Sequence, residues 1–385
     1  MPSADCAVPP VTLVEAVHVR VPFRRPLLDA TGEFTHRRLW LLRIVDEQGR
    51  EGLGEAALSP TADDITTGAL AALLRELVPA LVTGQAPSWS VLAAEGEPGR
   101  AAMAAVEGAL SALDAGQGTA GGNVAPIPVS ATISFGGPDA GADAAAQAVE
   151  LGFETLKLRA GFERTTDHLV DRLRAIRAAV GPEPRVRIDA GGAWDLDTAA
   201  ERMAAMEPFL IEYVEQPLAA WDMTGHAALR DRVRVPVALD ESIDSESSAR
   251  AALAEGAADV IVIKPARVGG SAATMRIVEA AAAAGATAVL GTFFESGVGI
   301  AAALRIAASM RATGRAPNPQ TSPPRRHSIP ALEPAHGLAT GGILGHDLLR
   351  VPLPIEKGRM AVHAAVDLDE SEVDRYALER IEARR

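Results

Sequence analysis

Cysteine is nearly absent from this chain, because Cys6 is the single one among 385 residues. One thiol excludes an intrachain disulfide framework. The first residues, 1–5, also lack the basic stretch followed by an apolar core that marks a secretory signal. Long apolar runs are missing as well, since the most apolar tracts are rich in alanine and interrupted by glycine or charge. These absences predict a cytoplasmic protein with no segment that spans a membrane.

Positive charge is scarce too. The 50 acidic residues outnumber the 37 lysines and arginines, so the formal net charge is −13 and the isoelectric point is near 5.2. Nucleic acids and anionic membranes are bound by clustered lysine and arginine, and no such cluster is evident. We therefore expect neither as a partner. An anionic substrate has to be bound by local cations.

No low-complexity linker divides the chain, although its length and its 48% content of hydrophobic residues suffice for more than one domain. Residues 1–125 combine strand patterns with amphipathic helical patterns at 66–81 and 100–115, which predicts an α+β domain. Residues 126–325 alternate short apolar runs with helical stretches, which is typical of parallel βαβ units. The remaining segment, 326–385, is expected to complete the barrel and to pack on the N-terminal domain, with a short extended piece at 349–355 and a charged final helix.

Three carboxylates follow three successive apolar runs. Asp189, Glu215 and Asp240 are 26 and 25 residues apart, and Lys264 follows after another 24. One strand and one helix of a (β/α)8 barrel take about 30 residues, since about 250 residues make eight such units. Each of these residues therefore falls at the carboxyl end of a successive strand, where barrel enzymes carry their catalytic groups. The spacing predicts a divalent-metal site at the barrel mouth.

Basic side chains flank this trio in chain order. Lys157 and Arg159 end the apolar run before it, and Lys264 ends the run after it. Because alternate residues of a strand point to one face, Lys157 and Arg159 share a face. A metal between two basic faces suits removal of a proton from the carbon beside a carboxylate, since the resulting enediolate has two negative oxygens to stabilise.

The motifs, taken in order, resemble those of the enolase superfamily, and specifically of its muconate-lactonizing subgroup, over nearly the whole chain. They are Lys-x-Arg at 157–159, Asp-Ala-Gly-Gly-Ala-Trp at 189–194, Glu-Gln-Pro at 215–217, Asp-Glu-Ser at 240–242, Ile-Lys-Pro at 263–265 and Glu-Ser-Gly-Val-Gly at 295–299. The resemblance implies a modified TIM barrel of the (β/α)7β type with an α+β capping domain. Residues 128–133 and 336–341 look most like o-succinylbenzoate synthases. Residues 263–270 look like the branch shared with N-succinylamino acid racemases.

The resemblance also implies roles for the polar residues. Asp189, Glu215 and Asp240 would bind Mg²⁺, with Mn²⁺ as an alternative, because hard cations prefer oxygen ligands. Lys264 is the expected base, since a metal and a second cation nearby push the pKa of a lysine down. Lys157, on the other face, completes the catalytic set together with Arg159.

Two positions depart from the family's pattern. Arg159 stands where the subgroup carries the second lysine of Lys-x-Lys, and arginine is a poor base because its pKa exceeds about 12. We expect Arg159 to hold the substrate carboxylate or to stabilise the intermediate while Lys264 acts alone. Gly191 stands where the family commonly has asparagine, which removes a hydrogen bond beside the metal ligands.

Four further residues are candidates for substrate binding. The resemblance places Arg24 and Leu27 in a capping-domain loop, residues 23–32, that closes over the barrel mouth. Glu295 fits two roles about equally well, as a residue that lines the site and as a cap of the following helix. Arg267 fits the substrate site, with a purely structural ion pair as the alternative.

These inferences predict an enzyme that abstracts a proton α to the carboxylate of a small substrate. Syn dehydration to o-succinylbenzoate, a step of menaquinone biosynthesis, is the first hypothesis. The alternative within the same fold is a racemase, epimerase or cycloisomerase for an N-acylamino acid, a dipeptide or a muconate-like substrate. A catalytically silent barrel with a binding role is the hypothesis from another class, because both departures concern the site. We also expect a homo-oligomer.

Overall fold

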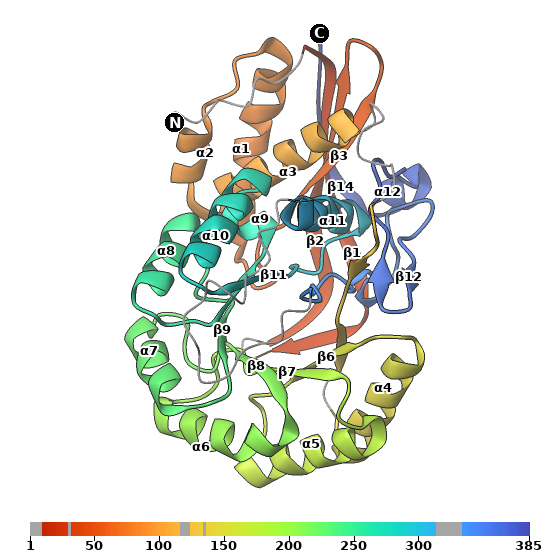
Figure 1. Ribbon diagram of the computed structural model, residues 1–385. Coiled ribbons are helices and arrows are strands. Elements are labelled where there is room, and N and C mark those ends of the chain that lie inside the picture. Colours follow the sequence, from red (N-terminus) through yellow and green to blue (C-terminus); the bar gives the residue numbers. More distant parts are fainter. Residues whose placement is uncertain (1–9, 30–31, 116–123, 134–135, 313–332) are drawn as a thin grey trace.

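The computed structural model describes residues 10–29, 32–115, 124–133, 136–312 and 333–385. An antiparallel sheet with helices on one face forms the upper part of the molecule in Figure 1, and a curled parallel sheet surrounded by helices forms the lower part. The predicted combination of a modified TIM barrel with an α+β cap is confirmed. Residues 1–9, which include Cys6, lie outside the described residues, and the domain boundaries stay predictions.

The cap sheet has the strand order β14-β1-β2-β3. β1 (Val11–Asp29) and β2 (Gly32–Asp46) form a long hairpin, and a tight turn connects β2 to β3 (Glu51–Ala56). β14 (Ala377–Arg384) pairs antiparallel with β1, and the charged final helix expected in this segment is α12 (Glu370–Tyr376), which directly precedes it. Half-buried and exposed residues alternate strictly along β14. That period of two suits an edge strand, which keeps its charged side chains in water.

Three helices cover one face of this sheet, α1 (Asp64–Thr83), α2 (Trp89–Ala94) and α3 (Gly96–Ala115). β3 and α3 approach each other so closely that a Cβ on Gly54 would lie 1.9 Å from the carbonyl oxygen of Ala105. Among the described helices, α1 meets the length and hydropathy criteria of a membrane span, contrary to our expectation. Its leucines 70, 74, 77 and 81 are buried in the cap core, which accounts for its apolar composition.

The parallel sheet contains seven strands in the order β11-β10-β9-β8-β7-β6-β5. Their bounds, with those of the short strand β4 that precedes them, are β4 Ile127–Pro128, β5 Ala131–Ile133, β6 Thr155–Arg159, β7 Arg185–Asp189, β8 Ile211–Glu215, β9 Val237–Leu239, β10 Val260–Ile263 and β11 Thr287–Leu290. The connecting helices are α4 Pro138–Glu150, α5 Thr166–Val180, α6 Leu196–Met206, α7 Met223–Arg232, α8 Glu246–Ala254, α9 Pro265–Val268, α10 Ser271–Ala283 and α11 Gly297–Ala312. β6, β7 and β8 end at Arg159, Asp189 and Glu215, as the spacing predicts, while β9 and β10 end one residue before Asp240 and Lys264.

A short segment around His336 closes the barrel between β11 and β4. The His336 N–H donates to the carbonyl of Pro128, and the carbonyl of His336 accepts from Ser130 at 2.9 Å. On the other side, the Gly337 N–H donates to the carbonyl of Leu290 at 2.7 Å. The chain then continues through β12 (Ile355–Glu356), β13 (Arg359–Met360) and α12 (Glu370–Tyr376) to β14. This last segment therefore joins both parts of the molecule.

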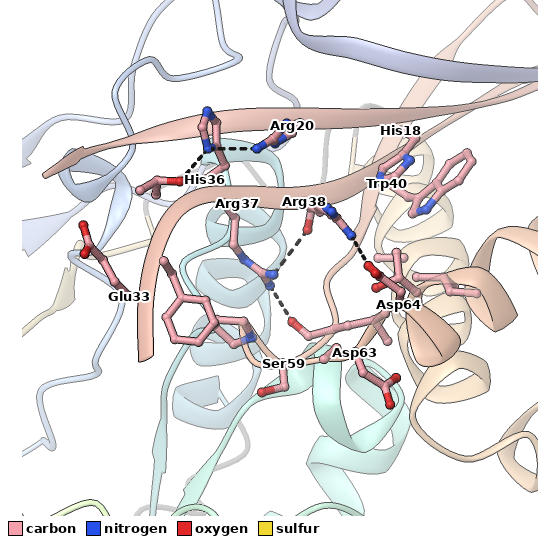
Figure 2. A pocket seen from close by; sticks show the side chains of 18 residues that line it. His18, Arg20, Glu33, His36, Arg37, Arg38, Trp40, Ser59, Asp63 and Asp64 are labelled. Carbon is pink, nitrogen blue, oxygen red and sulfur yellow. Dashed lines mark hydrogen bonds and ion pairs between the residues drawn. The ribbon is translucent and has the colours of Figure 1, made fainter. Parts of the chain in front are cut away.

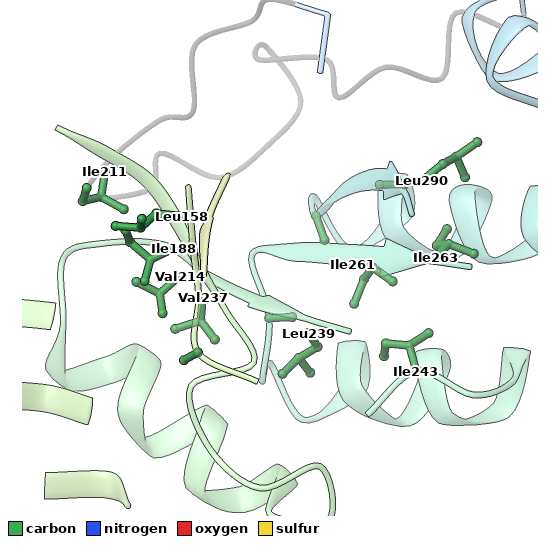
Figure 3. Packing of buried hydrophobic residues seen from close by; sticks show 14 of the residues in the cluster. Leu158, Ile188, Ile211, Val214, Val237, Leu239, Ile243, Ile261, Ile263 and Leu290 are labelled. Atoms are coloured by element: carbon green, nitrogen blue, oxygen red, sulfur yellow. The ribbon is translucent and has the colours of Figure 1, made fainter. Parts of the chain in front are cut away.

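Alternation along the barrel strands separates the packing core from the barrel interior. Apolar side chains at one set of positions pack against the surrounding helices, as Figure 3 shows for Leu158, Ile188, Val214, Leu239, Ile261, Ile263 and Leu290. Residues at the intervening positions form a separate small cluster made of Tyr213, Ala238, Val260, Val262 and Val289. The polar residues at the strand ends continue this second series, so their side chains face the barrel axis.

Candidate active site

The strand register places the predicted carboxylates side by side. Arg159 at the end of β6 pairs with Asp189 at the end of β7, and Asp189 pairs with Glu215 at the end of β8. Glu215 pairs with Ala238 of β9, two residues before Asp240. The three carboxylate residues are only 5%, 1% and 4% exposed, in chain order. Parallel strands thus bring three buried acidic residues to one end of the barrel.

Two lysines contact these carboxylates from strands that lie four positions apart in the sheet, β6 and β10. The Lys157 Nζ lies 2.7 Å from Glu215 Oε1 and 3.0 Å from Asp189 Oδ2. The Lys264 Nζ lies 2.6 Å from Asp240 Oδ2. In an eight-membered barrel, four strands apart means opposite sides. The acidic cluster is therefore held between two ammonium groups.

Burial and mutual repulsion set the protonation of this cluster. Burial, followed by the charges of Asp189 and Asp240, raises the pKa of Glu215 to about 8 despite the contact with Lys157. Burial would raise the pKa of Asp240 as well, but Lys264 and Lys157 bring it down to about 2. Burial disfavours a charged Lys157, yet the three carboxylates raise its pKa well above the usual range. The three carboxylates therefore favour the charged form of Lys157.

The donor set fits a hard divalent cation in its chemistry. Asp240 Oδ1 is buried without a hydrogen-bond partner, and three buried carboxylate residues converge at this end of the barrel. As they stand, no three acidic or histidine side chains of the described residues are grouped closely enough to hold a metal ion. The Lys157 ammonium bridges Asp189 and Glu215 instead. Joint ligation by these two requires Lys157 to withdraw, and the ligand set stays a prediction.

The two departures from the family pattern are neighbours in space. The Arg159 Nη1 lies 3.8 Å from Asp189 Oδ2. Gly191 has a φ of +56°, and a Cβ on it would lie 3.9 Å from Arg159 Nη2 and 4.0 Å from Asp189 Oδ1. Asparagine tolerates this left-handed conformation better than most residues, and its side chain would extend from that Cβ. The Arg159 guanidinium therefore lies beside the space that an asparagine side chain would use.

Glu241 is a polar residue of the site that the sequence reasoning missed. Burial, and then the charge of Asp240, raises the pKa of Glu241 to about 7, and its Oε2 is buried without a partner. The backbone carbonyl of Glu241 accepts a hydrogen bond from Arg267 Nη2 at 2.9 Å. Arg267 therefore braces the loop after β9. The signal for Glu241 was its place directly after Asp240 in the Asp-Glu-Ser motif.

Glu295 lies at the junction of barrel and cap. Its carboxylate accepts the backbone N–H of Phe293, whose ring lies 4.7 Å from the Lys264 Nζ. Burial raises the pKa of Glu295 and, together with the charge of Glu295, raises the pKa of Glu55 on β3 to about 8. Arg37 of β2 opposes both shifts. Glu55, which the sequence reasoning also missed, accepts hydrogen bonds from the N–H and the Oγ of Ser296 and so links the cap to the loop that follows β11.

Arg24 and Leu27 lie on the β1–β2 hairpin, so the expected loop over residues 23–32 is wrong in its conformation. Leu27 pairs with Phe34 of β2, and the Arg24 Nε donates to the carbonyl of Leu344 at 3.0 Å. Residues 30–31, at the hairpin tip, lie outside the described residues. After an irregularity between Pro22 and Leu27, the pairing of the two strands resumes within the segment where the resemblance placed a loop.

A cavity of about 460 Å³ lies on the face of the cap sheet that carries α1. Figure 2 shows His18, Arg20, His36 and Arg38 along one wall, with Asp63 and Asp64 opposite. The Asp63 carboxylate caps α1, and Asp64 pairs with Arg38 at 2.9 Å. The acidic and basic side chains that line the cavity balance each other, and it contains none of the residues predicted for the site. We assign it no role.

Residues 140–368 match the family described as Enolase C-terminal domain-like, which covers more than half of the chain. The chain belongs to the enolase superfamily. The o-succinylbenzoate synthase of Thermobifida fusca (strain YX) is 36% identical over 66% of this chain and 71% of its own length. The N-succinylamino acid racemase of Amycolatopsis sp is 31% identical over 76% of this chain and 82% of its own length.

Solved structures of the superfamily share the fold. The dipeptide epimerase from Cytophaga hutchinsonii, complexed with Mg and the dipeptide D-Ala-L-Val, has a TM-score of 0.76 at 22% identity. The comparison covers 97% of this chain and 99% of that chain. Enolase-superfamily enzymes generally use Mg²⁺, and the curated relatives are a lyase, an epimerase and a racemase. The chain is therefore an enolase-superfamily enzyme, and a Mg²⁺-dependent reaction is consistent with its relatives.

Proposed function

We propose that this enzyme abstracts a proton α to a carboxylate and catalyses a dehydration of the o-succinylbenzoate synthase type. The observation that carries the proposal is the pair of lysines on opposite sides of the carboxylate cluster, Lys157 on β6 and Lys264 on β10. One of them is held as a cation by three carboxylates. The other contacts a single carboxylate and an aromatic ring. We propose Lys264, which has the fewer carboxylate contacts, as the base opposite the Lys157 ammonium.

We propose Asp189, Glu215 and Asp240 as the residues that hold Mg²⁺, with Mn²⁺ as the alternative ion. Bound there, the ion would supply positive charge for the two oxygens of a substrate carboxylate as its α-carbon loses a proton. The Lys157 ammonium, which contacts Asp189 and Glu215, would supply further positive charge at the edge of this cluster. The Arg159 side chain is 29% exposed, against 12% for Lys264. Its planar guanidinium is therefore the more accessible cation and could bind a second carboxylate of the substrate through two hydrogen bonds.

Syn dehydration needs one base, and this supports it over racemisation. In a syn elimination the group that removes the α-proton can return it to the departing hydroxyl on the same face, so Lys264 suffices. Racemisation needs proton transfer on both faces, and the second-strand position of the family's other base is occupied here by Arg159, which stays protonated. The relative from Thermobifida fusca, an o-succinylbenzoate synthase, supports the same choice.

A racemase or epimerase is the second candidate. Lys157 lies across the barrel from Lys264, where a second proton donor would act, and the relative from Amycolatopsis sp is an N-succinylamino acid racemase. The fixed positive charge of Lys157 is compatible with donating a proton and opposes removing one. A two-way racemisation would therefore require the charge of Lys157 to be relieved during the reaction.

The test is a comparison of substrates in D₂O with and without Mg²⁺. The purified enzyme is given the hydrated, non-aromatic precursor of o-succinylbenzoate, an N-succinylamino acid and a dipeptide, and products and α-hydrogen exchange are followed by NMR. We expect Mg²⁺-dependent formation of o-succinylbenzoate with the highest kcat/KM of the three. Faster racemisation of the amino-acid substrate would establish the alternative. Absence of exchange on every substrate would indicate a silent barrel.

A further inference from the structure

Gln216, the residue after Glu215, is held in an unusual backbone conformation. Its φ is +42°, in the left-handed region that residues other than glycine rarely adopt. The residue is 0% exposed. Its N–H donates to the carbonyl of Ala238 at 2.8 Å, and its own carbonyl accepts from Gly192 at 2.6 Å. The backbone of Gln216 is therefore fixed by the strand ends on both sides of it.

The Gln216 side chain crosses to the next strand end. Its Oε1 accepts the backbone N–H of Asp240 at 3.0 Å and that of Ser242 at 3.2 Å. Its Nε2 donates to Ser242 Oγ at 2.8 Å and to the carbonyl of Leu218 at 3.1 Å. An amide side chain has two donor and two acceptor positions, and all four are used. Reversing the amide would set its NH₂ against two N–H donors, so its orientation is fixed.

The buried residue His226 forms hydrogen bonds with the segment that follows Gln216. The His226 Nδ1 lies 2.7 Å from the carbonyl of Asp222, and the His226 Nε2 accepts the backbone N–H of Leu218 at 3.3 Å. A carbonyl only accepts, so Nδ1 carries the proton and the imidazole is neutral. The Ser242 Oγ in turn donates to the carbonyl of Ala220 at 2.8 Å. The network thus closes on itself around Gln216.

The network connects two of the proposed metal ligands through very few bonds. Glu215 precedes Gln216 directly, and the Asp240 N–H is bound by the Gln216 side chain. The direct ladder between β8 and β9 pairs Glu215 with Ala238 and does not extend to Asp240. Beyond the end of that ladder, the Gln216 amide replaces the missing strand contact. Gln216 is thus the residue that connects the two strand ends from which the carboxylates of Glu215 and Asp240 project.

We propose that Gln216 is a positioning residue that sets the spacing of the Glu215 and Asp240 carboxylates and thereby the affinity for a divalent cation. The metal part of this proposal rests on the ligand set of the proposed function. Groups that orient metal ligands typically change affinity by about 10- to 100-fold when they are removed. The spacing part concerns this chain's own side chains and is judged without a metal.

The experiment compares Gln216→Met with Ser242→Ala in Mg²⁺ titrations by calorimetry, without substrate. Methionine keeps the length of the side chain and removes the amide, whereas Ser242→Ala removes one hydroxyl and leaves both N–H groups bound to Gln216 Oε1. We expect affinity to fall by about 10- to 100-fold in Gln216→Met, and by less than about threefold in Ser242→Ala. Thermal unfolding of both variants shows that each is folded. Gln216→Asn, which tolerates a positive φ but is one methylene shorter, replaces Gln216→Met if that variant does not fold.

The proposal is overturned if the Gln216 variant binds Mg²⁺ within about threefold of the wild-type affinity. It is also overturned if Ser242→Ala loses as much affinity as the Gln216 variant. Crystal structures of the wild type and of the Gln216 variant supply the second readout. We expect the Asp240 carboxylate to move relative to Glu215 by about 1 Å, a displacement large enough to matter in a catalytic site. If the Asp240 and Glu215 carboxylates occupy the same positions in both crystal structures, Gln216 does not set their spacing. A wild type that binds no Mg²⁺ refutes the proposed ligand set, while the two crystal structures still decide the role of Gln216.

Discussion

Surroundings, more than residue type, separate the two lysines of the site. Lys157 contacts Asp189 and Glu215, and the charges of three carboxylates hold its proton. Lys264 contacts Asp240 on one side and the ring of Phe293 on the other. A base must release its proton before it can accept another. Of the two, Lys264 contacts one carboxylate where Lys157 contacts two, and we propose Lys264 as the base.

Lys264→Ala should lower turnover by about two to four orders of magnitude, which is the usual contribution of general acid–base catalysis. Exchange of the substrate α-hydrogen, measured by NMR in D₂O, should be lost with it. Lys157→Ala, the matched control on β6, should impair charge stabilisation and retain slow exchange. Retained exchange in Lys264→Ala together with its loss in Lys157→Ala would reverse the assignment.

The neighbouring departures Arg159 and Gly191 should act as a unit. A Cβ at position 191 would lie 3.9 Å from Arg159 Nη2, so Gly191→Asn alone should crowd the guanidinium, and Arg159→Lys alone should leave space beside Asp189. The double variant should lose less kcat/KM than the sum of the two singles, with a coupling of about 0.5–3 kcal/mol. Steady-state kinetics of all four proteins measure this coupling. Additive losses would show that the two positions are independent.

Elements were predicted well where burial is complete on both faces. The apolar runs that end at Arg159, Asp189 and Glu215 each became a strand ending at that residue, because a polar side chain after a buried run ends the hydrophobic pattern. The same spacing brought the carboxylates together. Composition alone does not show which strand a charged segment pairs with. Residues 377–384 alternate as a strand does, but they form one only because β1 lies beside them.

The site shows a similar division. Residues at strand ends were found from spacing, since a parallel sheet fixes where they converge. Glu55 and Gln216 were missed because their roles depend on contacts between distant segments, such as the hydrogen bond from Ser296 to Glu55. The Lys157 bridge between two carboxylates was missed for the same reason. Which side chains contact one another at the open end of the barrel depends on their packing. A single sequence does not show that packing.

The β1–β2 hairpin should govern substrate choice. Arg24 donates a hydrogen bond to the carbonyl of Leu344, and Leu27 packs in an apolar cluster with residues of β2 and of the segment after Leu344, so both hold this part of β1 in place. Arg24→Ala or Leu27→Ala should change the ratio of kcat/KM between two substrates more than it changes the melting temperature. Arg20→Ala, on the same hairpin beside His36, is the control. A uniform loss on all substrates that follows stability would show a purely structural role.

The closing segment of the barrel should make stability depend on pH. The His336 Nδ1 accepts the Leu290 N–H at 3.0 Å, and burial, with Arg187 and Arg311, lowers its pKa from 6.5 to about 3. Between these values the unfolded chain binds a proton that the folded chain does not. The contribution of His336 to stability is therefore complete above pH 6.5. It is lost as pH falls toward 3, with a slope of up to about 1.4 kcal/mol per pH unit.

His336→Asn removes this titration while keeping an acceptor for the Leu290 N–H. Denaturant unfolding at about pH 7 and about pH 5 measures the difference in the free energy of unfolding. The wild type should lose more stability than His336→Asn over this interval. Equal losses in the two proteins would assign the pH dependence to other groups.

Across the whole molecule, cap and barrel are joined by buried polar contacts as well as by apolar packing. The Glu107 carboxylate of α3 accepts hydrogen bonds from Ser271 Oγ at 2.7 Å and from the N–H of Ala272, at the start of α10. Arg305 of α11 donates to the carbonyl of Gly108 at 3.2 Å. The two parts should therefore unfold together. The proposed homo-oligomer stays a prediction that light scattering in solution can test.

Mg²⁺ should stabilise the whole molecule if the acidic cluster binds it in the folded state alone. At a concentration of about 100 times Kd, the free energy of unfolding should rise by about 2.7 kcal/mol. The melting temperature should rise accordingly in the wild type and much less in Asp240→Asn, because one anionic ligand has been removed. Calorimetric titration of the same two proteins links the thermal shift to affinity. Unchanged Mg²⁺ binding in Asp240→Asn would remove Asp240 from the ligand set.

Because β14 pairs with β1, the cap sheet cannot be completed until translation of the chain is almost finished. Leu13 pairs with Arg384, so two adjacent strands of one sheet are made about 370 residues apart. At about 5–20 residues per second, β1 waits roughly 20 to 75 s for its neighbour. During that interval the outer edge of β1 presents unpaired N–H and carbonyl groups to other nascent chains. The edge of β1 is therefore unpaired mainly during synthesis of the chain. A chain truncated before β14 would keep this edge unpaired.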